Sequence, residues 1–555
     1  MGDLGSTVKC NGRSGPLHYT FSPLGGTLPS RFHPYRPAAR KCRRPHLALL
    51  LALSTIAAGQ DRIVEPEDTF RTATRLVVVD VVVTDRSGKP VRDLSGPDFT
   101  VLEDGVPQTI ASFEAPEPVA DQAVQKTDTP QRPRESTGSS KAPTQATPPA
   151  LNILVLDELN SEVIDQAYAR RAIEKFLRQH GPQLAQPTSL MILGQKRLEL
   201  LHDFTLNAAA LAEALHRRHA ELPFGLMTAE FGGAGERLSK SLWALQQIAA
   251  ANNRFEGRKN VIWVGPGFPM LNPMQALDPA DRPRFQAVIR EDANILVEAR
   301  VSIYTVNPRG LEVSPVMYGT GSGDNFFTGT QDQTTGELLF ENLAPLTGGR
   351  IVRLRNDVDA AISESVEDGA AYYSVAYYPS NHRWNGKFRR IEVKLGDATL
   401  RARTRQGYFA VPDAPLTDPQ IDTVLSRAVM SPLPYRALTV AVSAKSAGPQ
   451  RGRFMVNVEA QTLSWETLPG NKRRCEVTVV IASVGAGDKV YSHKVTELES
   501  VVDATHFAVH LGKPVTFRIE TPLPPKTRYV RVVVRDARND HIGSADLPRE
   551  VLPFH

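Results

Sequence analysis

The sequence predicts an α/β protein, built on a doubly wound, mostly parallel sheet that is flanked by β-sandwich-like regions. Residues 151–370 alternate short apolar runs with segments of helical periodicity, as expected for strands covered on both faces. Residues 75–115, 371–410 and 435–550 carry β-branched runs separated by turn residues. Hydrophobic residues make up 41% and charged residues 23% of the 555, which excludes a wholly disordered or fibrous chain.

Residues 41–60 have the layout of a secretory signal peptide. A basic start is followed by an apolar run over 47–53 and by small residues before Gln60. The run is shorter than the ~20 residues that span a bilayer. We therefore expect residues 1–60 to be a leader and the protein to be exported, to the periplasm, the cell envelope or the outside. A retained leader is the alternative, and it is the only membrane contact we expect. The basic residues are Lys41, Arg43 and Arg44.

The charge of the chain is concentrated in this leader. Residues 1–60 carry +7, so residues 61–555 carry −2 of the total of +5. Binding to nucleic acid depends on Lys and Arg side chains that displace counterions from phosphates. We therefore expect no nucleic-acid partner.

The cysteines exclude two further kinds of structure. Cys10 and Cys42 lie in the leader, so Cys475 is alone in the exported chain and cannot form an intrachain disulfide. The sequence contains neither a CxxC pair nor an HExxH motif, which leaves thiolate and zincin-type zinc sites without support.

Residues 61–115 predict a small β-segment. It has too few strands to be stable alone, so we expect it to pack with the β-segment of residues 371–410. Residues 116–150 are rich in Pro, Thr, Gln and Ser and lack aromatic residues, which predicts a disordered linker. The strands expected in the first segment are Val77–Val83, Phe99–Glu103 and Gln108–Phe113.

Residues 151–370 predict the α/β domain. Between its strands lie four helical patterns, marked for example by Leu238, Leu242 and Leu245 at spacings of four and three. Only the short segment Gly194–Arg197 separates the second strand from the third, so we expect one antiparallel hairpin strand in a parallel sheet with right-handed crossovers. The six expected strands are Leu151–Leu156, Ser189–Leu193, Leu198–His202, Asn260–Val264, Val301–Val306 and Arg350–Leu354.

The remainder of the chain predicts a second sandwich. We expect residues 411–434 to be a linker and residues 435–550 to form the C-terminal β-sandwich. Its expected strands are Leu438–Ser443, Arg453–Thr462, Cys475–Ser483, Thr505–Leu511, Thr516–Glu520 and Tyr529–Arg535.

Chemistry is expected where the first strand of the α/β domain ends. Ligands of doubly wound sheets bind at the C-terminal ends of the strands. Asp157 leaves the apolar run at that edge, followed by Asn160 and Ser161. Carboxylate, amide and hydroxyl oxygens suit a hard cation such as Mg²⁺. We expect the strand to deliver Asp157 to an exposed rim.

This part of the chain resembles the von Willebrand factor type A (vWA) domain. The resemblance is closest to a vWA-related family of secreted acidobacterial proteins, and it covers roughly residues 75–410. Segments like the second to fifth strands of the vWA fold are ILGQKRLELLHDFT, GRKNVIWVGPGFP and ARVSIYTVNPRGL. Segments similar to those that flank the domain in that family are DVVVTDRSGKPVRDLSGPDFTVLEDGVPQTI, YYSVAYYPSNHRWNGKFRRIEVKL and RARTRQGYFA.

The resemblance implies a metal-ion-dependent adhesion site, which this sequence matches only in part. The family pattern is D-x-S-x-S, with a Thr from a second loop and an Asp from a third. Asp157 and Ser161 fit the first loop, whereas Leu159 replaces its middle Ser. Asn160 supplies one further oxygen, and Thr228 lies in a plausible second loop. The third loop, GPGFP, has no carboxylate. The implied site is degenerate, with Mg²⁺ or Mn²⁺ as its ion.

A structural role for the same residues is the alternative. Asp157, Asn160 and Ser161 would form the strand-to-helix turn, with Ser161 or Asn160 capping the following helix. Glu162 and Asp165 would then lie at the positive end of that helix.

These observations predict a non-enzymatic binding protein. We expect an exported vWA-type protein that binds a protein ligand, in adhesion or assembly, through its strand-end loops. One alternative is a metal-free structural scaffold of the cell envelope. Another is a metal-assisted hydrolase, which would need a second carboxylate near Asp157. Glu158 is the closest, but its adjacent position would point it away. The G-x-S-x-G motif of α/β-hydrolases is also missing.

Overall fold

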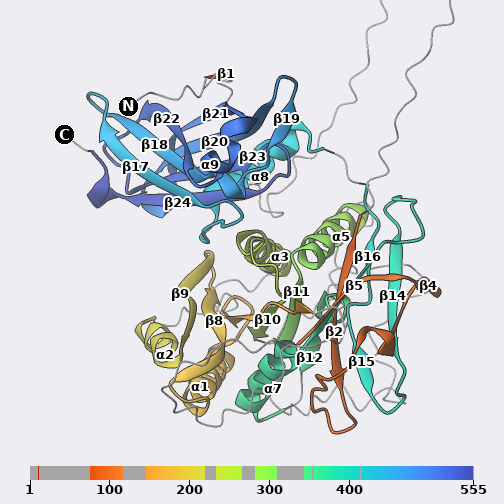
Figure 1. Cartoon of the computed structure of the whole chain (residues 1–555). Helices are drawn as coiled ribbons and strands as arrows, with labels where there is room; N and C mark the ends of the chain where they lie inside the picture. Colours follow the sequence, from red (N-terminus) through yellow and green to blue (C-terminus); the bar gives the residue numbers. More distant parts are fainter. Residues whose placement is uncertain are drawn as a thin grey trace, which may run out of the picture.

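The computed structural model describes residues 10–11, 75–116, 145–218, 233–265, 282–308, 343–352, 355–412 and 415–553. Three parts are visible in Figure 1: a central α/β unit, a β-unit beside it, and a C-terminal β-unit above helices α3 and α5.

The centre of the α/β unit is a six-stranded sheet in the order β12-β11-β10-β7-β8-β9. Neighbouring strands are parallel, except that β9 runs antiparallel to β8. The mixed α/β class and the single antiparallel hairpin strand are thus confirmed. The strands are β7 (Leu151–Asp157), β8 (Gln183–Leu193), β9 (Leu198–Asn207), β10 (Lys259–Val264), β11 (Val301–Val306) and β12 (Arg350–Val352).

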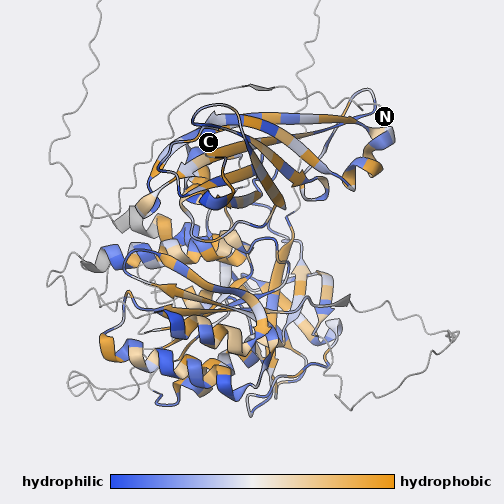
Figure 2. Ribbon diagram, turned by 90° about the vertical axis from the view of Figure 1, so that its left-hand side faces the viewer, coloured by the Kyte–Doolittle hydropathy of each residue, from blue (hydrophilic) through white to orange (hydrophobic). Residues whose placement is uncertain are grey.

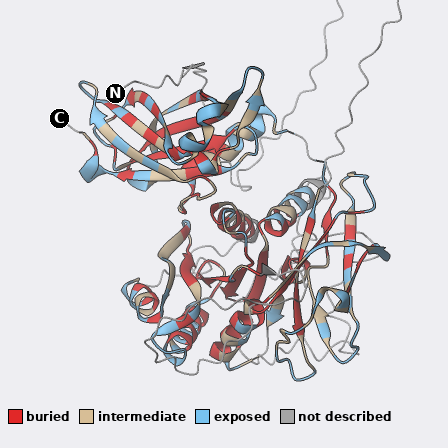
Figure 3. Ribbon diagram, in the orientation of Figure 1, coloured by how far each residue is buried: buried red, intermediate tan, exposed pale blue. Residues whose placement is uncertain are grey.

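Helices cover both faces of this sheet, because every residue of β7 is buried and its side chains alternate between two cores. Leu154 and Leu156 belong to the core beneath α1, α2 and α7. Ile153 and Val155 belong to the core beneath α3, α5 and α6. Figure 3 shows the central strands as the most buried part of the unit. The helices are α1 (Val163–Gln179), α2 (Ala208–Arg217), α3 (Gly233–Ala251), α5 (Arg282–Glu298), α6 (Leu343–Leu346) and α7 (Val358–Ala370).

The β-unit is built from both flanks of the α/β domain. Strand β13 (Tyr373–Tyr377) lies between β2 (Val77–Thr84) and β5 (Ile110–Ala115), and β14 (Phe388–Leu395) pairs with β3 (Phe99–Glu103). The two segments therefore share one pair of sheets and one core. The remaining strands are β4 (Val106–Gln108), β6 (Gln145–Ala146), β15 (Arg401–Arg403) and β16 (Gly407–Phe409).

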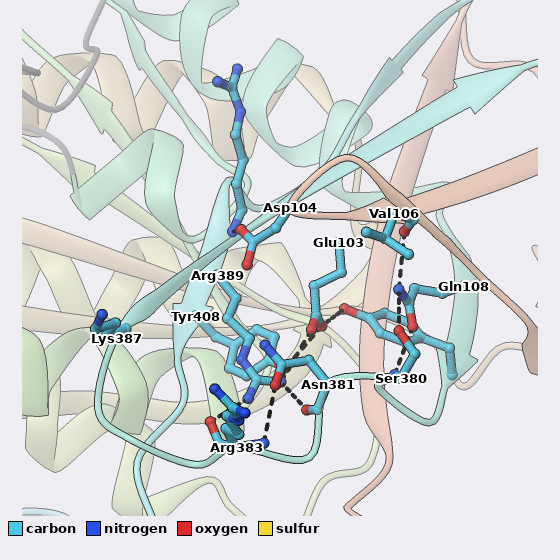
Figure 4. Close-up of polar contacts among 12 residues, drawn as sticks. Glu103, Asp104, Val106, Gln108, Ser380, Asn381, Arg383, Lys387, Arg389 and Tyr408 are labelled. Carbon is cyan, nitrogen blue, oxygen red and sulfur yellow. Dashed lines mark hydrogen bonds and ion pairs between the residues drawn. The ribbon is translucent and has the colours of Figure 1, made fainter.

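A buried ion pair joins the two segments inside this β-unit (Figure 4). Arg389 donates to Glu103 over 3.1 Å, and both side chains are almost fully buried. The hydroxyls of Tyr377 and Tyr408 donate to the same carboxylate over 2.7 and 2.9 Å. Arg389 also donates to the carbonyl of Asn381 over 2.7 Å. Glu103 comes from the N-terminal segment and its partners from residues 371–410, so the network crosses from one segment to the other.

The segment predicted to be a linker carries a packed helix. Helix α8 (Asp418–Met430) buries Leu425, Ala428 and Val429 against Val480 and its neighbours in the C-terminal β-unit. A capping box between Thr417 and Gln420 begins the helix, and Pro419 occupies its first turn. The segment expected to be a linker, residues 411–434, therefore contains a capped helix that packs on the C-terminal β-unit.

The C-terminal β-unit consists of two sheets around a common core. The predicted strand Thr505–Leu511 is wrong, because Asp503 accepts a hydrogen bond from the amide of Thr505 and begins a short helical stretch that ends in α9 (Phe507–Leu511). The strands are β1 (Cys10–Asn11), β17 (Val440–Ser446), β18 (Arg451–Glu459), β19 (Glu466–Leu468), β20 (Lys472–Val484), β21 (Val490–Asp503), β22 (Pro514–Pro522), β23 (Tyr529–Asp536) and β24 (Ile542–Pro548).

Polar contacts connect the C-terminal β-unit with the α/β unit. The hydroxyl of Tyr435 donates to the Gln247 side chain on α3 over 3.2 Å, and Arg254 donates to Thr439 over 2.9 Å. Arg436 forms an ion pair with Asp203 on the edge strand β9.

Hydropathy along the ribbon alternates in many of the strands (Figure 2). Within the described parts of the chain, no helix combines the length and the apolar character needed to cross a membrane.

Candidate binding site at the strand ends

Asp157 is the last residue of β7, at the C-terminal edge of the sheet. The chain leaves β7 toward β8 on one side, and its later strand β10 lies on the other, so the strand order reverses here. Such a switch point is where open α/β sheets place their ligand sites. The Asp157 side chain itself is fully buried. The expectation that it lies on an exposed rim is therefore wrong.

The Asp157 carboxylate is satisfied by neighbours within the fold. One oxygen accepts from the backbone amide of Asn160 over 2.9 Å. The other accepts from the Asn160 side chain over 2.8 Å and from the Trp263 indole over 2.9 Å. The Asn160 amide group also donates to Ser241 on α3 over 3.1 Å. Asp157 therefore ties the turn after β7 to β10 and, through Asn160, to α3.

The surroundings of Asp157 favour the protonated acid. Burial raises the pKa of Asp157 to about 6, although the hydrogen bonds from Asn160 and Trp263 oppose this shift. Burial and hydrogen bonding therefore act in opposite directions on this carboxyl group, and burial has the larger effect.

The residues after Asp157 form a strand-to-helix turn without the predicted helix cap. Ser161 donates its hydroxyl to the backbone carbonyl of Asp157. Helix α1 begins at Val163, with Glu162 at its N-cap position and no side-chain cap. The capping role predicted for Ser161 or Asn160 is therefore wrong, because both side chains are directed back to Asp157.

Gly265 allows the neighbouring strand to come close to this turn. A Cβ atom placed on Gly265 would lie 2.6 Å from the Cβ of Asp157. Real side chains do not approach one another so closely, so glycine is required directly after β10. Its amide donates to Val306 at the end of β11 over 3.0 Å, which aligns three strand ends at one edge.

Glu158 is directed to the opposite side of the turn. Its side chain is fully buried and accepts from Arg170 on α1 over 2.5 Å. Arg218 lies 3.9 Å from the second oxygen. The carboxylates of Asp157 and Glu158 thus serve separate networks, and they do not form the carboxylate pair that a hydrolytic site would need.

The described residues do not fit the implied Mg²⁺ or Mn²⁺ site. Both oxygens of Asp157 accept bonds from N–H groups, and Ser161 directs its hydroxyl to a carbonyl. One further oxygen, Oδ1 of Asn160, is buried without a hydrogen-bond partner in the described part of the chain. A hard cation requires about six oxygen ligands and is bound more tightly as ligand charge increases. Thr228 lies outside the described residues.

An apolar surface follows the turn directly. Val163, Ile164 and Tyr168, in the first turns of α1, are 53%, 61% and 55% exposed. Large apolar side chains that cluster on a surface commonly mark a site of protein contact. Helix α1 packs on the sheet through Ala169, Ile173 and Phe176, so Ile164 and Tyr168 remain on its outer side.

The strand-end network also contains two residues that the sequence analysis did not find. Trp263 is the second-last residue of β10, and a polar handle on an apolar strand near the ligand edge is a usable signal. Ser241 lies in the middle of α3, where its hydroxyl donates to Arg237 over 2.9 Å. Nothing in its local sequence distinguishes it from an ordinary helical serine.

A large concave site lies at the other end of the sheet. A cleft of about 890 Å³ is lined by Asn152, Phe176 and Val366 together with residues of the 85–93 segment. Asn152 is near the start of β7, so this cleft is remote from Asp157. Among the described residues, the strand-end edge thus combines the exposed start of α1 with the buried Asp157.

Comparisons with known proteins give limited similarity. No protein-family model matches the chain, and no curated protein does. Among solved structures, the VWA domain of SpRpn10 is 13% identical, with 40% of this chain and 96% of that chain covered and a TM-score of 0.20. The N-terminal domain of TFIIH p34 is 14% identical, with 39% and 96% covered and a TM-score of 0.20.

A von Willebrand factor type A protein from Catenulispora acidiphila is 12% identical. The match covers 74% of this chain and 67% of that chain, with a TM-score of 0.22. Scores at this level do not establish a family. Membership of the family of secreted acidobacterial proteins stays a prediction from the sequence.

Proposed function

We propose that this chain is an exported, non-enzymatic binding protein whose vWA-like α/β domain docks a protein partner at the C-terminal edge of its sheet. The observation that carries the proposal is the exposed apolar start of α1, directly after the turn anchored by Asp157. A rigid turn positions Val163 and Ile164 at the switch point, where ligands of such sheets bind. Prepositioned apolar side chains bind with little loss of conformational entropy.

The hairpin and strand positions support the vWA-like part of the proposal. The segments that resemble the second and third strands of that fold form the antiparallel pair β8 and β9. Those that resemble the fourth and fifth form β10 and β11, which pair with one another in parallel. The leader supports export.

The same domain without a metal is the form we favour. This preference is supported by the N–H donors around Asp157, which occupy the carboxylate oxygens that a cation would otherwise bind. A metal-free scaffold of the envelope remains the second candidate, supported by the extensive pairing between the two flanking segments. Calorimetric titration with Mg²⁺ or Mn²⁺ separates both from a metal-dependent site, since we expect no heat of binding.

Site-directed crosslinking tests the proposed function. A photoreactive amino acid replaces Glu162, which is exposed at the N-cap of α1. A matched variant carries it at Glu550, which is exposed in the C-terminal β-unit. We expect a discrete adduct with an envelope protein from position 162 alone, and we expect Ile164→Asp to abolish it. Equal adducts from both positions, or an adduct that survives Ile164→Asp, would argue for the scaffold.

A further inference from the structure

The outer face of helix α1 differs in chemistry from one end to the other, and this difference points to a class of partner. We infer that this face binds an amphipathic protein segment whose apolar side chains are followed by carboxylates. The inference rests on the proposed function and specifies the class of partner. It follows from two properties of one helix face: an apolar half and a basic half.

Five of the exposed residues of α1 lie along one line. Ile164, Tyr168, Arg171, Lys175 and Arg178 are separated by four, three, four and three residues, which places them on one side of a helix. The line is about 21 Å long at 1.5 Å per residue. The buried residues of α1 belong to the core below the sheet, so this line is not part of the fold's own packing.

The first half of the line is apolar. Ile164 and Tyr168 on the line, and Val163 beside it, are each more than half exposed and fall within six consecutive positions of the chain. Exposed large apolar side chains elsewhere in the described residues are spread over several elements. Removing apolar surface from water yields about 25 cal/mol per Å². This cluster therefore supplies a driving force for association that the free protein leaves unused.

The second half of the line is basic. Lys175 pairs with Asp359 of α7 over 2.8 Å. Arg171 and Arg178 are exposed, and within the described residues neither has a carboxylate partner. Arg178 lies in the last turn, where it complements the negative end of the helix dipole. Arg171 lies mid-helix, so the helix dipole gives it no such role.

A groove adjoins the basic half. Its volume is about 430 Å³, and its walls between α1 and α2 include Leu177, Arg178, Ala208 and Ala212. Small side chains on α2 leave room for a side chain of a partner that lies along α1. Two acids, Glu174 and Glu213, also line the groove, and Glu213 is 3.4 Å from Arg217. The groove thus extends the docking surface beyond the basic residues.

These features favour a partner segment in which apolar residues are followed by acidic ones. A segment that covers Ile164 and Tyr168 with apolar side chains brings its continuation over Arg171 and Arg178. Carboxylates there complete ion pairs, and basic residues there are repelled. A lipid surface is disfavoured, because residues 61–555 carry a net charge of −2 and only two unpaired cations lie on this face.

Peptide binding to the full-length protein tests the inference. The probe is a labelled synthetic helix of about 18 residues with Leu and Phe on one half and Glu on the other. Its matched control has Lys in place of each Glu. We expect the acidic peptide to bind about tenfold more tightly than the basic one at low salt, by fluorescence anisotropy.

Variants on the helix face locate the site. Ile164→Asp should weaken the acidic peptide about tenfold, and Arg171→Glu with Arg178→Glu should reverse the preference so that the Lys peptide binds better. The controls are Val509→Asp and Arg518→Glu, which are exposed in the C-terminal β-unit and should change nothing.

Three results would overturn the inference. The first is binding that does not distinguish Glu from Lys. The second is an effect of Ile164→Asp no larger than that of Val509→Asp. The third is binding to vesicles of equal parts phosphatidylglycerol and phosphatidylcholine that the acidic peptide does not displace. A crosslink at position 162 that forms while the peptide fails would leave the proposed function standing, whereas loss of that crosslink would reject the function itself.

Discussion

At the scale of single residues, two buried acids are surrounded by protein atoms in place of water. Asp157 was predictable as the strand-end acid, because the apolar run before it ends at the edge of the sheet. Its burial was not predictable, because the donors that cover it come from Trp263 and Asn160, and the donor on Trp263 is distant in sequence. A second acid, Asp292 on α5, is buried at the contact between α3 and α5 and gave no signal in the sequence.

Asp292→Asn should change how the free energy of unfolding depends on pH. Burial raises the pKa of Asp292 to about 7 from 3.8; Glu291 adds to the shift, and Gln246 and Arg427 oppose it. Because the folded state binds the proton more tightly, stability is lost as pH rises from about 4 to about 7. The Asn variant has no titrating group at this position, so it does not undergo this loss. Its free energy of unfolding, measured with urea, should exceed that of the parent by up to about 4 kcal/mol at pH 8, and most of this difference should disappear by pH 4.

Glu291→Gln is the matched control for this experiment, because Glu291 is the exposed neighbour of Asp292 on the same helix. Because burial is the main cause of the Asp292 shift and Glu291 only adds to it, this variant should keep most of the pH dependence of the parent. An Asp292→Asn variant whose stability parallels that of the parent from pH 4 to pH 8 would show that the acid is solvated.

At the scale of elements, hydrophobic periodicity predicted many of the strands and helices. How these elements pack depends on contacts between segments that are distant in sequence. The six strands of the α/β sheet follow from apolar runs of the right length. Helix α8 was not predicted, because it is stabilised by packing against the C-terminal β-unit, which its local sequence does not reveal. The Glu103–Arg389 pair was also missed, since its partners are separated by 286 positions.

Breaking the Glu103–Arg389 pair should destabilise the β-unit strongly. Arg389→Met leaves a buried carboxylate with only hydroxyl donors, and Glu103→Leu leaves a buried guanidinium with carbonyl partners. Each should cost about 3–5 kcal/mol, because an uncompensated buried charge is expensive. The double variant should cost less than the sum, since it removes both charges. Thermal unfolding measures the three variants against the parent.

The exposed pair Lys394–Glu392, with 3.7 Å between its charged atoms, serves as the control. Lys394→Ala should change stability by less than about 1 kcal/mol. Strictly additive costs for Arg389→Met and Glu103→Leu would mean that the two side chains do not depend on one another.

At the scale of the whole molecule, the C-terminal β-unit touches the strand-end edge beside β8, where Arg197 forms an ion pair with Asp488 over 2.5 Å. Strand β13 is held between β2 and β5, so the two flanks of the α/β domain form one body. The C-terminal β-unit lies above α3 in Figure 1, and Tyr435 contacts Gln247 of that helix. The outer face of α1 lies on neither contact. The sequence patterns predict the division of the chain into these units. Which face of α1 is exposed is seen only in the structure.

Hydrogen exchange of the complex with the crosslinked partner is the most direct test that docking occurs at the strand ends. The account predicts that amides of residues 158–168 exchange more slowly in the complex, because the partner covers the turn after Asp157 and the start of α1. Unchanged exchange over 158–168, with protection confined to residues 435–553, would contradict it.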